Sequence, residues 1–160
     1  MLRPATPDDR DRVLAWRNHP EVRGVSLTQH VIAADEHARW WERTVADGTR
    51  RILIYERDGE PSGVVTFWDL DRSSGWWGYY LDNAGVDARG VRFPAWIAVQ
   101  REAVRYARDV LGLEELHGET LTSNTAVREL NARQGFDEVE VSETEVGGER
   151  IEYVHIRKRL

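Results

Sequence analysis

The chain contains no cysteine among its 160 residues. A disulfide framework, a thiolate zinc site and a cysteine nucleophile are therefore excluded, and a reducing cytoplasm is permitted. The five histidines lack the spacing of metal ligands, so no metal site is expected. No apolar run approaches the ~18 residues of a membrane span, and the first residues are charged where a signal peptide would be apolar. We therefore expect a cytoplasmic protein without a membrane partner.

Lysine is almost as scarce, since Lys158 is the only one among 22 basic residues. Acidic residues number 28, and the formal net charge of −6 argues against a surface that binds duplex nucleic acid. A local group of arginines is still sufficient to bind a small anion. Tryptophan, by contrast, is abundant. The seven include the pairs Trp40-Trp41 and Trp76-Trp77, whose rings can fill a core or form flat walls for a ligand.

The order of apolar patterns predicts one α/β domain over residues 1–160, with a largely antiparallel sheet. The expected strands cover residues 2–4, 51–55, 62–70, 76–81, 116–121, 138–144 and 150–157. The expected helices are one capped at Thr6 or Asp8 and ended by His19-Pro20, then 34–46, one from Pro94 to Gly112, and one from Ser123 to Gly135.

Three details of this sheet are predicted. Residues 76–121 form one parallel crossover, from strand to helix to strand. Gly78, inside a strand, indicates a bulge or a close backbone approach, and we favour the bulge. Edge strands at Glu138–Thr144 and Arg150–Arg157 could pair in a homodimer, although their alternating charges also suit protection against such pairing.

The crossover places a turn and a helix N-terminus after a strand, and such a turn favours anion binding. Residues 82–95 occupy this place, and Arg89 and Arg92 add charged donors suited to a pyrophosphate. A solvated loop explains the same arginines equally well. Asn124, in the first turn of the next expected helix, can pair with ligand amides or can simply begin the helix.

Five short stretches together resemble the GNAT acetyltransferase superfamily over nearly the whole chain. They are Trp16–Arg23, Glu36–Trp41, Gly78–Asp82, Glu119–Leu121 with Asn124, and Gly135-Phe136. Within the superfamily they resemble the RimJ/RimL-like and PseH-like branch, and the PseH-like members N-acetylate nucleotide-linked 4-amino sugars. The resemblance implies a mixed, mostly antiparallel sheet of about seven strands flanked by about four helices, with a splayed central strand pair.

The resemblance also implies a donor site for acetyl-CoA. Backbone groups near Tyr80, Leu81 and Asp82 would bind the pantetheine arm, and Asn124 would contact it from the opposite helix, which also carries Asn131. The following loop, Arg89, Gly90, Val91, Arg92 and Phe93, would bind the pyrophosphate. A backbone N–H near Tyr80 or Leu81 would polarise the acetyl carbonyl.

Two features depart from the family pattern. The loop offers Gly90 but no second glycine, so that the backbone approaches phosphates less freely, and Pro94 supplies no N–H. Asn131 stands where many members carry a tyrosine that protonates the leaving thiolate. Solvent or another hydroxyl, such as Tyr79, Tyr80 or Ser123, would then have to serve.

An amine must lose a proton before it attacks a thioester. The possible bases are Glu119, Asp69, Glu36 and His37, each with a structural alternative: an ion pair for Glu119, a turn for Asp69 and packing on Trp41 for His37. The expected acceptor walls are the tryptophans at 16, 40, 41, 68, 76 and 77, with Arg17, Arg23 or Arg39 for a phosphate.

These residues favour an N-acetyltransferase that uses acetyl-CoA and a small-molecule amine, first a nucleotide-linked amino sugar. A peptide N-terminus or an antibiotic amine is an alternative acceptor, and a peptide would need an open groove. The altered loop leaves open a carrier protein or an aminoacyl-tRNA as donor. The alternative that is not an enzyme is a binding protein with the same fold and an inactive donor site.

Overall fold

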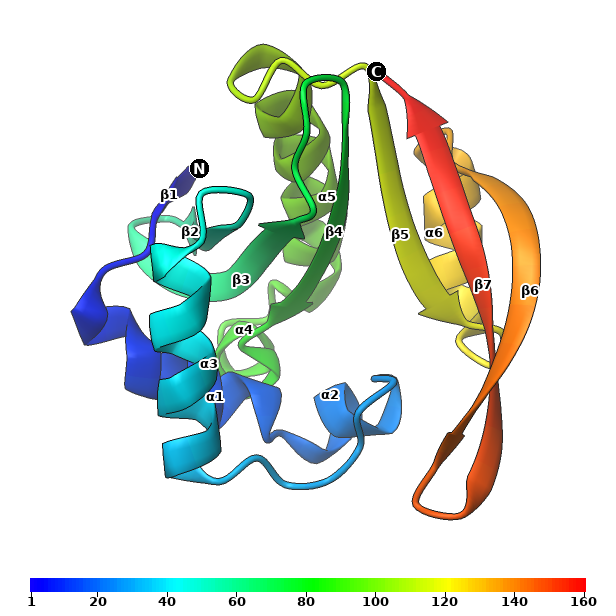
Figure 1. Cartoon of the computed structure of the whole chain (residues 1–160). Helices are drawn as coiled ribbons and strands as arrows, with labels where there is room; N and C mark the ends of the chain where they lie inside the picture. The colour runs from blue at the N-terminus through cyan, green and yellow to red at the C-terminus, as the bar shows by residue number, and fades with distance from the viewer.

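The computed structural model describes residues 1–160 as a seven-stranded sheet in the order β1-β2-β3-β4-β5-β7-β6 (Figure 1). The strands are β1 Leu2–Pro4, β2 Arg51–Arg57, β3 Glu60–Trp68, β4 Ser74–Leu81, β5 Glu115–Leu121, β6 Asp137–Val146 and β7 Glu149–Arg159. The helices are α1 Arg10–Arg17, α2 Pro20–Gly24, α3 Ala34–Ala46, α4 Asn83–Ala88, α5 Arg92–Asp109 and α6 Thr125–Arg133, after a short 3-10 turn at Pro7–Asp9. The predicted α/β class is confirmed, and α2 and α4 are additional short helices.

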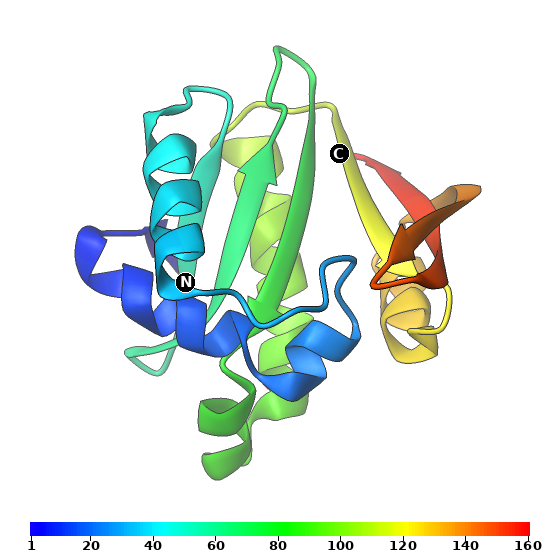
Figure 2. The ribbon, with the colours of Figure 1, turned by 60° about the horizontal axis from the view of Figure 1, so that its bottom comes forward.

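Two groups of helices cover the two sides of the sheet (Figures 1 and 2). We call the side with α1, α2 and α3 the front face and the side with α5 and α6 the back face. Alternation along β2 divides its side chains between them, since Ile52 and Ile54 join the front core and Leu53 and Tyr55 join the back core. Both faces of β2 and β3 are therefore buried, which explains their continuous apolar runs.

The sheet opens between β4 and β5. These strands run parallel and pair only at Ser74↔Glu115, Gly75↔Leu116 and Trp76↔His117. Beyond Trp76 they diverge into the V that Figure 1 shows. The splayed pair is thus confirmed, and α4 and α5 form the predicted crossover between its two strands.

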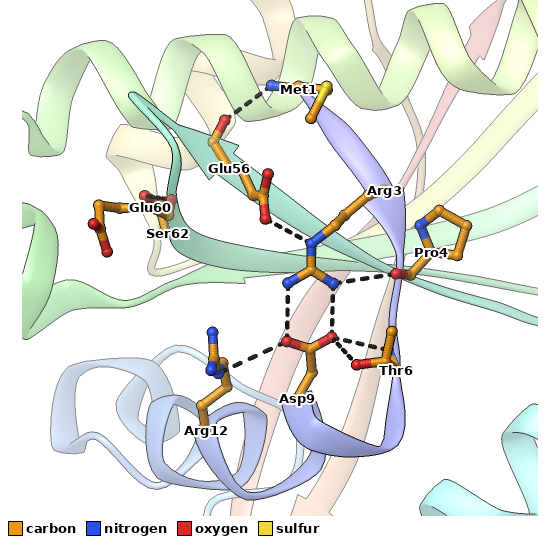
Figure 3. A network of polar contacts seen from close by, with 9 residues as sticks. All are labelled: Met1, Arg3, Pro4, Thr6, Asp9, Arg12, Glu56, Glu60 and Ser62. Carbon is orange, nitrogen blue, oxygen red and sulfur yellow. Dashed lines mark hydrogen bonds and ion pairs between the residues drawn. The ribbon is translucent and has the colours of Figure 1, made fainter.

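An ion-pair network fixes the N-terminal segment at the edge of the sheet (Figure 3). The guanidinium of Arg3 binds both carboxylate oxygens of Asp9, at 2.7 and 3.0 Å, and Nε donates to Glu56 at 2.6 Å. The Thr6 N–H also donates to Asp9, at 2.8 Å. These bonds hold the pKa of Asp9 at about 2, with the Arg3 hydrogen bonds as the main cause.

Two predicted details of the sheet are wrong. The pairing of β3 with β4 is regular through Thr66↔Gly78, so Gly78 forms no bulge there. The Trp68 ring lies beside Gly78, where a Cβ would be in ordinary van der Waals contact with it at 3.4 Å. The strand β7 lies between β5 and β6, so only β6 is an edge at this end. None of the helices combines the length and the apolar character needed to cross a membrane.

Candidate active site

A cavity of about 560 Å³ fills the opening between β4 and β5. Its walls come from both strands, from α2 and Val25-Ser26 on the front face, and from α5 and α6 on the back face. The predicted site residues that line it are Trp77, Tyr80, Leu81, Arg92, Phe93, Glu119, Asn124 and Asn131. Since the cavity reaches both faces of the sheet, two reactants can approach the same point from opposite sides.

Much of the expected pyrophosphate loop forms the short helix α4, and its polar groups make hydrogen bonds within the protein. Asp82 caps this helix by accepting the Gly85 N–H at 3.0 Å. The Gly90 and Val91 amides donate to backbone carbonyls, each at 2.9 Å, and Arg89 donates to Ser62 Oγ at 2.8 Å. Asp82, Arg89, Gly90 and Val91 therefore do not line the cavity. In α4 these polar groups close the turns of the helix, and their predicted role in donor binding stays a prediction.

Arg92 does reach the cavity, but its charge is already compensated. Its guanidinium binds Asp87, and Nη1 donates to Glu21 Oε2 of α2 at 2.6 Å. These two carboxylates raise the pKa of Arg92 above its usual range. The backbone N–H groups of Arg92 and Phe93, in the first turn of α5, have no acceptor within the helix and remain open to an anion.

A buried polar network joins α5 to α6 behind the cavity. Gln100 Nε2 donates to Asn131 Oδ1 at 3.0 Å and to the Tyr79 hydroxyl at 2.9 Å. Asn131 Nδ2 in turn donates to Thr120 Oγ1 on β5, at 3.1 Å. Each end of the Asn131 amide thus makes one hydrogen bond within the protein, which positions Asn131 in the wall of the cavity and leaves its second N–H for a ligand.

Tyr79 was one of several hydroxyls considered from the sequence, and the structure gives it a distinct setting. Its oxygen accepts from Gln100 and also interacts with the Trp96 side chain, so its own hydrogen is free to point into the cavity. Burial raises the pKa of Tyr79 well above its ordinary value, so the phenol keeps its proton. Sequence reasoning missed Gln100, although a lone glutamine on the buried face shared by Ala103 and Ala107 was a usable signal.

Among the four bases considered from the sequence, only Glu119 lies at the cavity. No hydrogen bond or ion pair engages its carboxylate, and desolvation raises its pKa above the ordinary carboxyl value. Asp69 occupies an exposed turn with a φ of +49°, outside the cavity. His37 is buried, its Nε2 bonds to the Arg10 carbonyl at 3.0 Å, and Glu36 pairs with His30 at 2.9 Å.

Most of the tryptophans expected in an acceptor wall serve the cores. Trp16 and Trp41 are buried in the front core, and Trp40 stacks on His37 with 5.4 Å between ring centroids. Trp77 belongs to the back core, although one edge reaches the cavity. Arg17 lies beside these residues and donates to the Thr28 carbonyl at 2.7 Å. Trp68 and Trp76, by contrast, remain half-exposed on the front face.

A second hollow, of about 440 Å³, lies between α5 and α6 on the back face and shares Phe93 and Trp96 with the first. Arg101 and Arg133 line it, and neither takes part in an ion pair or a side-chain hydrogen bond. Glu129 lies in the same wall. The hollow therefore offers two uncompensated guanidinium groups and two aromatic rings directly beside the cavity.

Comparison with known proteins gives one family match and several relatives. The family described as acetyltransferase (GNAT) domain matches residues 1–137. The acetyltransferase PseH of Campylobacter jejuni is 23% identical over 124 residues, which cover 78% of this chain and 74% of that protein.

Solved structures share the fold. The spermidine N-acetyltransferase of Vibrio cholerae, in complex with CoA and spermine, superposes with a TM-score of 0.84 at 14% identity, covering 99% of this chain and 94% of that one. The Campylobacter jejuni PseH complex with acetyl coenzyme A gives 0.65 at 16% identity and covers 97% of each chain.

Proposed function

Because the chain belongs to the acetyltransferase (GNAT) domain family and is an N-acetyltransferase, we propose that it transfers the acetyl group of acetyl-CoA to a primary amine of a small molecule. A nucleotide-linked amino sugar is our first candidate acceptor. The observation that carries the proposal is Glu119, a carboxylate without a partner, which lies in a cavity between two splayed strands and is open to both faces of the sheet.

We assign the donor to the back side of the V. Acetyl-CoA or CoA is bound in the solved complexes of PseH and of the Vibrio enzyme, which supports the same donor here. The pantetheine arm would lie along Tyr80 and Leu81, with the free amide nitrogen of Asn124 opposite. The α5 N-terminus would receive the pyrophosphate through the Arg92 and Phe93 amides. The nucleotide end would continue into the α5–α6 hollow.

The amine would approach Glu119 from the front face. Glu119 would take a proton from the ammonium group, and the neutral nitrogen would then attack the thioester carbon. The carbonyl oxygen would gain negative charge, which the backbone N–H groups of the splayed β4 segment can stabilise. Tyr79, on the opposite side of β4, would donate its free hydroxyl hydrogen to the departing sulfur.

The shape of the front entrance favours a small acceptor. Val22, Val25 and Ser26 line this side of a cavity of about 560 Å³, a volume that suits a small molecule, whereas a peptide substrate would need an open groove. The Vibrio enzyme, a spermidine N-acetyltransferase, supports a small-molecule acceptor. Trp68, whose ring lies beside the cavity residue Gly78, offers a flat surface that suits a sugar ring or a nucleobase.

The test is an acetyl-transfer assay that follows thiol release from acetyl-CoA. A nucleotide-linked 4-amino sugar, spermidine and an N-terminal peptide would be compared as acceptors, with the wild-type protein and Glu119→Gln. We expect the amino sugar to give the largest kcat/KM, and Glu119→Gln to lower kcat by about 100-fold or more with little change in acetyl-CoA binding.

Calorimetric titration with acetyl-CoA provides the control for this assay. If acetyl-CoA binds in the micromolar range but only the peptide is acetylated, the small-molecule proposal is wrong. If acetyl-CoA does not bind at millimolar concentration, the donor assignment is wrong, and an acyl-carrier protein or aminoacyl-tRNA donor gains support.

A further inference from the structure

A chain of titratable side chains on the front face continues from the cavity along β5 and β7. Glu115, His117 and Glu119 alternate on one face of β5, and His155 stands on β7 directly opposite Glu119. Side chains opposite each other in an antiparallel pair have Cβ atoms about 5 Å apart. His155 is therefore the cross-strand neighbour of the only candidate base that lies at the cavity.

A hydrogen bond and an ion-pair contact connect this histidine to the far end of β5. His117 Nε2 lies 2.7 Å from Glu115 Oε1, and His117 Nδ1 lies 2.9 Å from His155 Nε2. Both imidazole rings stack on Trp76, with centroid distances of 5.2 Å for His117 and 4.8 Å for His155. The rings are thus held in position by packing as well as by hydrogen bonds.

The order of these bonds determines where the hydrogens lie. The ionised Glu115 carboxylate can only accept, so His117 donates from Nε2 and a neutral His117 has a bare Nδ1. That bare nitrogen must accept from His155, so His155 carries its hydrogen on Nε2. The remaining nitrogen of His155, Nδ1, is then free to take a proton.

From this geometry we propose that His155 takes over the amine proton from Glu119, and that Glu115 and His117 are positioning residues that hold His155 in the proton-accepting tautomer. The inference rests on the proposed function of Glu119. In the step, the ammonium N–H bond breaks and a Glu119 O–H bond forms. The proton then passes through a bridging water molecule to His155 Nδ1, because no direct hydrogen bond joins the two side chains; this leaves Glu119 ionised and His155 as an imidazolium that releases its proton to solvent.

The charges around His155 suit this role. The groups that face it are His117, Glu115 and Glu119 on β5, Glu140 on β6, and Arg157 on its own strand. Burial, followed by the proximity of His117, lowers the pKa of His155 below its ordinary value, so the ring is neutral and able to accept at neutral pH. The carboxylates of Glu140 and Glu115 would stabilise the imidazolium formed in the step.

The tautomer can be measured without any acceptor. Two-bond nitrogen–proton correlation spectra of the wild-type protein with labelled histidine should show His155 protonated at Nε2 only. Glu115→Gln should remove this single tautomer, because an amide can donate to His117 as well as accept. A wild-type His155 with its hydrogen on Nδ1 would overturn the inference, whatever the acceptor proves to be.

The kinetic test compares His155→Asn with His155→Ala. Asparagine keeps a hydrogen-bonding group near the position of Nδ1 but cannot take a proton, so we expect both variants to lower kcat by about tenfold or more with the KM for acetyl-CoA unchanged. Imidazole added to the buffer should partly restore His155→Ala. His30→Asn, at a surface pair with Glu36, is the control and should keep wild-type kcat.

The outcomes separate this inference from the proposed function. If wild-type protein turns over an amine and His155→Asn does so at the same rate, His155 has only a structural role and the inference fails. If wild-type protein turns over no amine, the proposed function fails, and the tautomer spectrum still decides whether Glu115 and His117 orient His155.

Discussion

Gln100 on α5 and Asn131 on α6 are joined by a 3.0 Å hydrogen bond in the buried space behind the cavity. The two helices flank opposite strands of the V, so this bond connects the two halves of the site across the opening of the sheet. Asn131 also donates a hydrogen bond to the hydroxyl of Thr120, and Gln100 donates one to the hydroxyl of Tyr79. The Gln100–Asn131 pair therefore stabilises the fold and at the same time holds the walls of the cavity in position.

Asn131→Ala should lower the free energy of unfolding by about 2–3 kcal/mol, because Gln100 and Thr120 lose a partner in a buried place. Denaturant unfolding followed by fluorescence measures the change. Asn83→Ala is the matched control, since Asn83 makes one exposed contact of 3.3 Å, and it should change stability by less than about 0.5 kcal/mol. Equal losses for the two variants would contradict a structural role for the network.

Tyr79→Phe removes the hydroxyl that we assign to the departing sulfur and leaves the ring in its stack with Trp77. We expect kcat to fall by about 10- to 100-fold and the KM for acetyl-CoA to remain unchanged. Steady-state kinetics at varied acetyl-CoA measure both. Tyr80→Phe, on the opposite face of β4, tests the alternative hydroxyl, and a larger loss of kcat there would move the assignment to Tyr80.

Arg101 and Arg133 should contribute to donor affinity through the 3′-phosphate of CoA. Replacing either by alanine should raise the KM for acetyl-CoA about three- to tenfold, since an exposed charge contact contributes about 1 kcal/mol. Acetyl-dephospho-CoA, which lacks that phosphate, is the matched control and should be unaffected. Equal increases of KM for both donors would show that the two arginines do not bind this phosphate.

The Arg3–Asp9 pair predicts a pH-dependent stability. The pKa of Asp9 falls from 3.8 to about 2 on folding, and its side chain is 2% exposed, so the pair stabilises the fold by about 2 kcal/mol. Because the folded pKa is the lower one, the stabilisation is complete above pH 3.8 and is lost as the pH falls towards 2.

Asp9→Asn should therefore cost about 2 kcal/mol at pH 7 and progressively less between pH 4 and pH 2. Urea unfolding at a series of pH values measures this difference. The neighbouring Asp8 is exposed and has no ion pair, so Asp8→Asn should be close to wild type throughout. If Asp9→Asn lowered the free energy of unfolding by the same amount at every pH, the loss would come from altered packing or hydrogen bonding and not from the charge of Asp9.

The fold was largely predictable because its signals are local. Alternating or continuous apolar runs marked the strands, helical spacing marked α3 and α5, and the turn at Asp58-Gly59 marked the β2–β3 hairpin, where both residues have positive φ. The predictions failed where a choice depended on distant partners. Gly78 keeps regular pairing with the neighbouring strand, and the position of β7 inside the sheet depends on its pairing with β5.

The site was less predictable, because residue type does not reveal what already binds a side chain. Arg89 and Arg92 are suited to phosphates by chemistry, but Ser62, Asp87 and Glu21 hold them. Asp69, Glu36 and His37 are chemically as plausible as Glu119. They differ from it in lying away from the cavity, and Glu36 and His37 also have partners within the protein. His155, which lies 36 residues from Glu119 in the sequence, becomes its neighbour through strand pairing alone.

By itself, the sequence determined the class of fold, the crossover that opens the sheet and the resemblance to acetyltransferases, because these depend on periodicity and on short motifs in order along the chain. Only the tertiary structure decided which polar groups are free for chemistry. A guanidinium or a carboxylate acts on a ligand only if no partner within the protein already binds it. Arg92 has one partner in the adjacent α4 and one in α2, 71 residues away, and Arg89 has its partner in β3.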